Sequence, residues 1–261
     1  MNPQLMGVVN VTPDSFSDGG RYLDPAAAIR HGEELVRCGA DILDVGGEST
    51  RPGAEPVQWG EELRRVEPVV AGLAGSGAAI SVDTSKSAVA AAAIGAGASI
   101  VNDVTALGDP EMGPVCAERG VGVVLMHMPG NPRTMQAEAR YEDVVDEVRA
   151  HLAERLELAL SVGIAEERIW LDPGIGFGKA AEHNLELLRR LGELRELGRP
   201  LVVGASRKSF IGSLDGSPVE DRLGGTIASS VLAAAEGADV LRVHDVAEMA
   251  QALRVAAAIL G

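Results

Sequence analysis

The sequence has 261 residues, enough for one large domain or two small ones. Hydrophobic residues make up 46% of the chain and aromatic residues only 3%, so the core must consist of Val, Ile, Leu and Ala, as in a packed α/β protein. The 23 basic and 38 acidic residues give a net charge of −15, and so acidic a surface excludes nucleic acid and anionic membranes as favoured partners.

The two cysteines, Cys38 and Cys116, show no metal-type spacing, and two lone thiols fit a reducing compartment better than a disulfide framework. No apolar run approaches the length of a membrane span. The first residues lack a charged leader followed by an apolar stretch, so no secretory signal is expected. These features predict a cytoplasmic protein with no membrane partner.

Eight short runs rich in Val, Ile and Leu recur along the chain, as in parallel strands that are covered on both faces. The predicted strands are Leu5–Asn10, Asp41–Gly46, Ala79–Asp83, Ser99–Asp103, Gly122–Met126, Arg168–Asp172, Leu201–Gly204 and Asp239–Val243. The predicted helices are Pro25–Cys38, Glu61–Leu73, Ser85–Ile94, Tyr141–Val162, Asn184–Leu197, Glu220–Glu236 and Asp245–Ile259. Eight strand–helix repeats without a break in composition favour one closed (β/α)8 barrel, a TIM barrel, as a single domain over residues 1–261. A doubly wound sheet is the alternative, but it usually has fewer strands and a lone glycine-rich first turn.

In a (β/α)8 barrel the functional residues lie on the loops at the carboxyl ends of the strands. Asp83, Asn102 and Asp172 end the third, fourth and sixth predicted strands, so all three side chains can point into the top of the barrel. Carboxylates accept hydrogen bonds and Asn both donates and accepts, which suits a flat heterocycle with amino and ring N–H groups. Capping the next helix is the alternative role for each carboxylate.

Four candidate basic residues could supply the local positive charge that an anionic substrate needs in so acidic a protein. They are Arg51, Lys208, Arg242 and His244. Arg242 and His244 alternate along the eighth predicted strand and therefore share a face. Opposite Asn10, which ends the first strand, they could hold a diphosphate group through charge-assisted hydrogen bonds. The alternatives are a surface ion pair for Arg242 and a helix cap for His244.

Two polar segments follow the first two strands: loop 1 (Val11–Tyr22) and loop 2 (Gly46–Gly53). Both are rich in Gly, Ser and Asp, and we expect them to be mobile loops that cover the mouth of the barrel. Ordinary surface turns would explain their glycines, but they explain Phe16, Arg51 and Pro52 less well.

The segment Gly174–Lys179 is similar to a phosphate-binding loop. It lacks that motif's spacing and its terminal Ser or Thr, so no phosphate site is assigned to it.

Seven ordered motifs resemble the dihydropteroate synthase family, over a stretch from residue 6 to the end of the chain. They are Asn10-Val-Thr-Pro-Asp-Ser-Phe-Ser-Asp-Gly-Gly, Glu48-Ser-Thr-Arg-Pro-Gly, Asp83-Thr-Ser-Lys, Asn102-Asp-Val, Asp172-Pro-Gly-Ile-Gly-Phe-Gly-Lys, Ser206-Arg-Lys-Ser and Arg242-Val-His. The resemblance implies a barrel enzyme, a transferase that joins 6-hydroxymethyl-7,8-dihydropterin diphosphate to 4-aminobenzoate and releases diphosphate. It also implies a requirement for Mg2+ and a homodimer.

Site residues follow from the resemblance position by position. The pterin would be bound by Asp83, Asn102, Asp172, Phe177 and Lys208, with the Arg242 guanidinium stacked on its ring. The diphosphate would be bound by Asn10, Thr50, Arg51, Arg242 and His244, and Asn10 would also contact the metal. The 4-aminobenzoate would be bordered by Phe16, Pro52 and Ser209. Catalytic roles would fall to Asp18, which stabilises developing charge, and to Arg51 and Lys208.

Two other functions remain open at this point. A methyltetrahydrofolate methyltransferase would also be a pterin-binding barrel, but it would not need Ser206-Arg-Lys-Ser or Thr50-Arg-Pro-Gly. A catalytically silent relative would bind a pterin without condensing it. The chain also begins only a few residues before Asn10, whereas many relatives have a longer lead with a hairpin across the barrel floor, so closure of the floor is left open.

Overall fold

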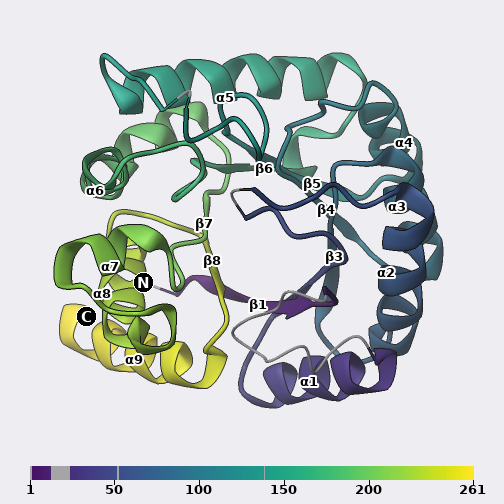
Figure 1. The fold of residues 1–261 in the computed structure, drawn as a ribbon, viewed down its shortest axis with the longest axis horizontal. Coiled ribbons are helices and arrows are strands. Elements are labelled where there is room, and N and C mark those ends of the chain that lie inside the picture. Colours follow the sequence, from purple (N-terminus) through teal and green to yellow (C-terminus); the bar gives the residue numbers. More distant parts are fainter. Residues whose placement is uncertain (1, 13–23, 52, 138) are drawn as a thin grey trace.

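The structure is a computed structural model that describes residues 2–12, 24–51, 53–137 and 139–261. All eight predicted strands form, and they pair in parallel in the order β6-β5-β4-β3-β2-β1-β8-β7. A parallel bridge between Leu171 and Leu201 joins the two ends of this sheet. Figure 1 shows the strands in the centre with the helices around them, so the prediction of a (β/α)8 barrel is confirmed.

The strands end close to their predicted limits. They are β1 (Gln4–Asn10), β2 (Ile42–Gly46), β3 (Ala79–Asp83), β4 (Ile100–Asp103), β5 (Gly122–Met126), β6 (Ile169–Asp172), β7 (Val202–Val203) and β8 (Val240–Val243). The α-helices are α1 (Pro25–Arg37), α2 (Trp59–Leu73), α3 (Ser87–Ala96), α4 (Met112–Arg119), α5 (Val144–Ser161), α6 (Ala181–Arg189), α7 (Ser209–Asp215), α8 (Leu223–Ala235) and α9 (Val246–Leu260). Three short 3-10 helices are η1 (Glu166–Arg168), η2 (Leu191–Leu197) and η3 (Val219–Asp221).

Several helix predictions differ from the structure. The predicted helix Asn184–Leu197 is divided at Arg190 into α6 and η2, and the predicted helix Glu220–Glu236 is divided into η3 and α8. The sequence analysis did not identify α4 or α7, which have only 8 and 7 residues. Such short segments carry too few turns for an apolar stripe to stand out.

The barrel interior is closed by a layer of apolar side chains. Met6, Ile42, Ile100, Val124, Val202 and Val240 form one buried cluster, with Trp170 packed against it. Most of these residues lie in the first half of their strands, so their side chains fill the floor. The floor is therefore closed by packing within the barrel, and the larger apolar cluster lies between the strands and the surrounding helices.

The strand register brings the predicted polar residues to one level. Asn10 is paired with Gly46, Gly46 with Asp83, and Asp83 with Asn102. On the next pair of strands, Met126 is opposite Asp172. Because parallel strands all end on the same side, these side chains surround one mouth of the barrel.

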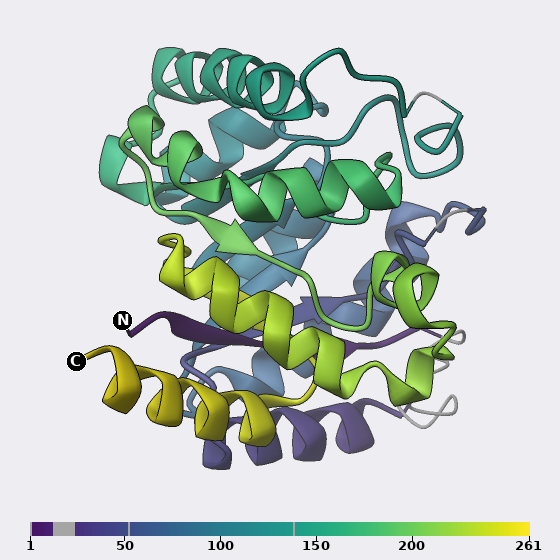
Figure 2. The same ribbon diagram turned by 90° about the vertical axis from the view of Figure 1, so that its left-hand side faces the viewer.

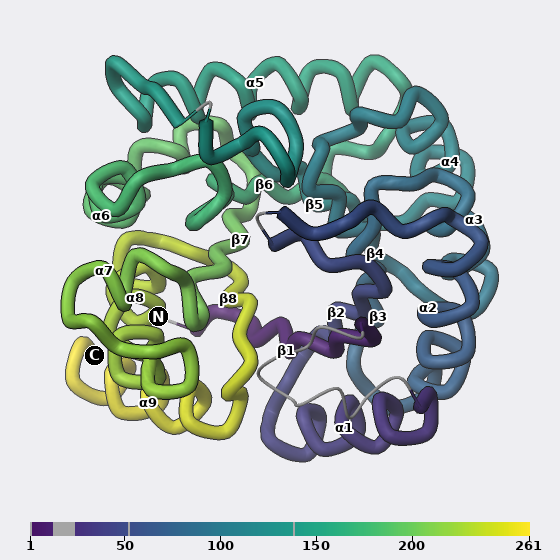
Figure 3. The backbone as a smooth tube through the Cα atoms, in the orientation of Figure 1, coloured from purple at the N-terminus to yellow at the C-terminus, as the bar shows by residue number. Residues whose placement is uncertain are grey.

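The loops gather at this mouth. Figure 2 shows both termini at the opposite end, with β1 running away from them toward the loops. In Figure 3 the dark-blue connection between β2 and α2 crosses in front of the barrel. No helix in the described part of the chain has the length and apolar character needed to cross a bilayer.

Candidate active site

The deepest part of the mouth is a narrow recess with about 20 Å³ of free space. Asp83, Asn102 and Asp172 line it, and all three are buried. Burial, followed by the neighbouring Asp44, raises the pKa of Asp83 from its ordinary 3.8 to about 7, while Arg242 opposes the rise. Burial also raises the pKa of Asp172, although its Oδ1 accepts a hydrogen bond of 2.7 Å from the Gly174 N–H. The recess therefore combines acceptors that are held out of water with an amide group.

Arg242 crosses the recess from β8. Its Nε donates to Asp44 Oδ2 at 2.6 Å, and its Nη2 donates to Asp83 Oδ2 at 2.9 Å. Burial acts to lower the pKa of Arg242, but the two carboxylates outweigh it and raise the pKa above its usual value. The guanidinium is therefore a fixed cation in the recess, and its alternative role as a surface ion pair is wrong.

Asp44, in the middle of β2, was missed by the sequence analysis. Its side chain is fully buried, and it accepts hydrogen bonds from Ser81 Oγ (2.6 Å), Asn102 Nδ2 (3.1 Å) and Arg242 Nε. One carboxylate thus orients both the amide of Asn102 and the guanidinium of Arg242. The signal in the sequence was an isolated acidic residue within the apolar run Ile42–Val45, which only a strong partner can stabilise.

Lys208 and Phe177 also line the recess. The Lys208 ammonium lies 3.9 Å from the centre of the Phe177 ring, within range of a cation–π interaction. Burial, together with Arg242, lowers the pKa of Lys208 to about 8, whereas Asp172 and Asp83 act to raise it. Lys208 therefore carries a charge at pH 7 and can lose a proton without a large change in pH.

The recess opens into a wider cavity of about 530 Å³. Its lining includes the remaining described residues that the sequence predicted: Asn10, Thr50, Arg51, Ser209 and His244. Arg207 and Arg222 also line it and were not predicted to do so, so the cavity is richer in cations than expected. Its walls come from loops that follow β1, β2, β5, β6, β7 and β8.

His244 differs from the expectation of a basic group. Burial, followed by the positive charge of Arg242, lowers the pKa of His244 to about 3, so its imidazole is neutral at pH 7. Ser206 Oγ accepts a hydrogen bond from the His244 backbone N–H (3.3 Å) and lies 2.9 Å from Nδ1. We assign the Ser206 proton to the bond with Nδ1, which places the imidazole proton on Nε2. His244 can then donate one hydrogen bond to an anion as a neutral ring.

An ion-pair network fixes the stem of the connection that carries loop 2. The Glu48 carboxylate contacts the Lys86 ammonium, and its Oε1 accepts from the Val57 N–H at 2.9 Å. Lys86 also contacts Glu62 Oε2 at 2.5 Å, and Glu62 is fully buried in α2. Arg65 donates to the carbonyl oxygen of Gly47 at 2.9 Å. Both ends of the connection are therefore held, and Thr50 and Arg51 are placed over the cavity.

Three predicted site residues lie outside the described residues: Phe16 and Asp18 in loop 1, and Pro52 in loop 2. Their roles, and the mobility of the two loops, stay predictions.

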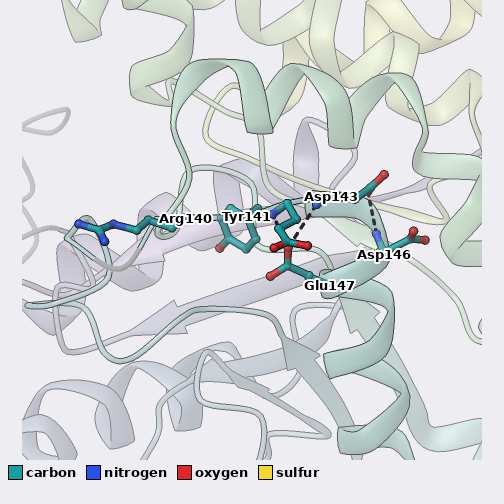
Figure 4. A pocket seen from close by; sticks show the side chains of 6 residues that line it. Arg140, Tyr141, Asp143, Asp146 and Glu147 are labelled. Carbon is teal, nitrogen blue, oxygen red and sulfur yellow. Dashed lines mark hydrogen bonds between the residues drawn. The ribbon is translucent and has the colours of Figure 1, made fainter.

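A second hollow, of about 610 Å³, lies at the start of α5. Figure 4 shows its lining, which includes Tyr141, Asp143, Asp146 and Glu147. Its carboxylates serve the helix itself: Asp143 Oδ1 accepts from the N–H groups of Val145 and Asp146, and Glu147 accepts from that of Asp143. The hollow is thus the capped start of α5, and Arg140 is the basic residue among those that line it.

The described residues contain no cluster of three or more His, Cys, Asp or Glu side chains that could hold a metal ion by themselves. The cavity does offer the amide oxygen of Asn10, and Mg2+ commonly takes one or two protein oxygens together with phosphate oxygens and water. The donor set therefore fits a metal that arrives with a diphosphate.

The raised pKa of Asp83 predicts a pH-dependent stability. A carboxyl group whose pKa is higher in the folded state stabilises the fold fully below its unfolded pKa, and this contribution is lost as the pH rises toward 7. We expect the melting temperature of the free protein to fall from pH 5 to pH 8, and to fall less in Asp83→Asn. An equal fall of the melting temperature in both proteins across this pH range would contradict the assignment of the raised pKa to Asp83.

Comparison with known proteins identifies relatives over almost the whole chain. Residues 6–244 match the family model described as "Pterin binding enzyme". The chain is 48% identical over 260 residues to the dihydropteroate synthase of Escherichia coli strain K12, covering 99% of this chain and 92% of the relative. A Xanthomonas albilineans dihydropteroate synthase solved with 4-aminobenzoic acid has 49% identity and a TM-score of 0.93, over 100% of this chain and 94% of that one. A structure of that organism's enzyme in complex with 7,8-dihydropteroate has 46% identity and a TM-score of 0.89, with the same coverage.

Proposed function

The chain belongs to the dihydropteroate synthase family of pterin-binding enzymes, and from this premise we propose how its barrel mouth condenses the two substrates. The protein is a transferase that joins 6-hydroxymethyl-7,8-dihydropterin diphosphate to 4-aminobenzoate, giving 7,8-dihydropteroate and diphosphate. One observation carries the assignment of roles: a buried set of carboxylates and an amide lies directly below a cavity that is rich in cationic groups.

The recess is the pterin site. Asp83, Asn102 and Asp172 face the amino and ring N–H groups of the pterin, while Phe177 and Lys208 cover its side. The recess is narrow, because Arg242 spans it to reach Asp44 and Asp83. Entry of the pterin therefore requires the Arg242 guanidinium to move aside, and stacking on the ring keeps the cation in the site.

The wider cavity is the diphosphate site. Asn10 and Thr50 supply an amide and a hydroxyl, Arg51 and Arg242 supply positive charge, and His244 donates from Nε2 as a neutral ring. These donors are oriented before the reaction, so they stabilise the charge that develops on the leaving diphosphate. Mg2+, which Asn10 would help to hold, supplies further neutralisation of that charge when bound.

The reaction exchanges one bond at the pterin methylene carbon. The bond from this carbon to the diphosphate oxygen breaks, and a bond to the aryl amine nitrogen forms. The positive charge that develops on the pterin is stabilised by the carboxylates of Asp83 and Asp172 beneath it, and Asp18 is assigned the same role from loop 1. The amine nitrogen then loses one proton to solvent or to the departing diphosphate. Arg51 places a positive charge beside the diphosphate, and Lys208 places one beside the pterin.

The 4-aminobenzoate binds at the outer rim of the cavity. Ser209, the first residue of α7, lines that rim next to Lys208. Phe16 and Pro52 are assigned the remaining walls, so this site combines a barrel residue with two loop residues.

Formation of 7,8-dihydropteroate tests the proposed function. The purified protein is incubated with the pterin diphosphate, 4-aminobenzoate and Mg2+, and the product is followed by chromatography and mass spectrometry. We expect product formation to require both substrates and to fall roughly ten- to hundredfold in Asp172→Asn, since a buried charged acceptor is removed. Binding of the pterin diphosphate without any product would identify a catalytically silent relative instead.

The quaternary state and the location are also proposed. Leu232 on α8, together with Val255, Ile259 and Leu260 on the neighbouring α9, are large exposed apolar side chains. Burying such a surface between two copies would remove it from water, which favours a homodimer through α8 and α9. Sedimentation at twice the chain mass of 27.0 kDa is expected, and sedimentation at the chain mass would contradict it.

The free thiols of Cys38 and Cys116 favour a cytoplasmic location.

A further inference from the structure

Lys179, the last residue of the glycine-rich segment after β6, points into the protein. Its relative exposure is only 4%. The ammonium lies 2.9 Å from His127 Nδ1 and donates to the carbonyl oxygens of Gly174 (3.0 Å), Phe177 (3.0 Å) and His127 (3.4 Å). A buried cation needs such partners, and here three backbone carbonyls and one imidazole nitrogen supply them. Lys179 is thus an internal cation around which the segment Gly174–Gly178 folds.

The backbone of this segment requires glycine at three positions. Gly174, Gly176 and Gly178 all have positive φ, at 69°, 83° and 55°. A Cβ on Gly174 would collide with the carbonyl oxygen of His127, and one on Gly176 would meet the Lys208 side chain. The segment is therefore pressed between the end of β5 and Lys208, and the Lys179 ammonium joins its two ends to His127.

This arrangement faces the pterin recess on its other side. The segment carries Phe177, whose ring packs on Val104, Met126, Met128 and Met135 and lies under the Lys208 ammonium. It also carries the Gly174 N–H that binds Asp172 Oδ1. Each of these groups lines or supports the recess, whereas Lys179 itself is not among the residues that line it.

The charge of Lys179 also acts on the recess. Burial raises the pKa of Asp172, and the Gly174 N–H, Lys208 and Lys179 oppose this rise. Burial lowers the pKa of Lys179 to about 7, and the Asp172 carboxylate opposes that fall. Burial and the Lys179 charge lower the pKa of His127 to about 2, so that its neutral ring can accept a hydrogen bond at Nδ1. Both the hydrogen bonds and the charge of Lys179 therefore connect it to groups that line the recess.

We propose that Lys179 is a positioning residue for the pterin substrate: from behind the recess, its ammonium holds the Gly174–Gly178 segment so that Phe177 and Asp172 face the pterin ring. This inference rests on the proposed function. A wild-type protein that binds no pterin would refute that function, whatever Lys179 does.

The test compares two ligands in Lys179→Met and Lys179→Ala. We expect the affinity for 6-hydroxymethyl-7,8-dihydropterin diphosphate to fall at least about tenfold, as for the loss of one charge-assisted hydrogen bond. Binding of 4-aminobenzoate in the presence of diphosphate and Mg2+ should change by less than about twofold, because that site lies on other loops. Wild-type pterin affinity in Lys179→Met, or an equal loss of both ligands in both variants, would overturn the proposal.

Chemical rescue separates positioning from a general role in folding. Methylamine can fill the space left in Lys179→Ala and restore the cation, so we expect it to recover pterin affinity there. It should leave the wild type unchanged and should not recover affinity in Phe177→Ala, the matched control, which lacks the ring but keeps the cation. No recovery in Lys179→Ala, or equal recovery in Phe177→Ala, would also overturn the proposal. Lys179→Gln, which keeps two N–H donors without the charge, should lie between Lys179→Met and the wild type.

Discussion

Arg242→Ala is expected to bind neither 6-hydroxymethyl-7,8-dihydropterin nor its diphosphate measurably. The guanidinium is the shared partner of Asp44 and Asp83, and its removal leaves two buried carboxylates next to each other without a cation. Breaking a buried ion pair in this way typically costs about 3–5 kcal/mol. A loss of this size in binding free energy corresponds to roughly 10²- to 10⁴-fold in affinity, and calorimetric titration of both ligands measures it.

His244→Ala is the matched comparison, because this residue lies in the cavity and contacts Ser206 rather than the carboxylates of the recess. It should bind the bare hydroxymethyl pterin nearly as the wild type does, and the diphosphate more weakly. Since the His244 ring is already neutral, the difference should change little between pH 6 and pH 8. If His244→Ala weakened the bare pterin as much as the diphosphate, the division into recess and cavity would be wrong.

The second large effect concerns the order of binding. We expect 4-aminobenzoate to bind measurably only after the pterin diphosphate, or diphosphate with Mg2+, is present. Loop 1 and loop 2 are polar and rich in glycine, and ordering each residue costs about 1–2 kcal/mol of backbone entropy. Anion contacts through Asn10 and Arg51 would offset this cost and bring Phe16 and Pro52 together around the aryl ring.

Two titrations of the wild type with 4-aminobenzoate measure this dependence, one of the free enzyme and one with diphosphate and Mg2+. A variant gives a second test, because the ion pairs of Lys86 with Glu48 and Glu62 hold the two ends of the β2–α2 connection, which contains loop 2. Lys86→Met should therefore raise the KM for 4-aminobenzoate, while the affinity for the bare hydroxymethyl pterin, whose recess contains no residue of loop 2, stays close to that of the wild type. Equal affinity in the two titrations would show that the aryl amine site is already formed.

The sequence predicted the strands better than the helices, for a physical reason. A buried parallel strand is a continuous apolar run, and its end is marked by a polar residue such as Asn10, Asp83 or Asp172. Helix limits depend on local capping and on packing partners that are distant in sequence. The break at Arg190 illustrates this, because its guanidinium binds both Glu193 and Asp143, 47 residues away.

Site residues were predicted where a polar motif follows the end of a strand. They were missed where the residue acts by holding another side chain. Asp44 gave only the weak signal of a carboxylate in an apolar run, since its partner Arg242 lies 198 residues away. His244 was correctly placed at the mouth, but its charge depends on burial and on neighbouring cations, which the sequence does not display. Lys179 ends the segment Gly174–Lys179, which does not match a phosphate-binding loop. Nothing in that segment indicated that the lysine would be an internal cation.

The central claim is that one mouth holds the pterin in the recess and the diphosphate in the cavity above it. A crystal structure of the protein with the pterin diphosphate and Mg2+ tests this directly. We expect the pterin edge within hydrogen-bond distance of Asp83, Asn102 and Asp172, and the diphosphate next to Asn10, Arg51 and His244. A pterin bound outside the recess, or a diphosphate that contacts none of those three cavity residues, would contradict the account.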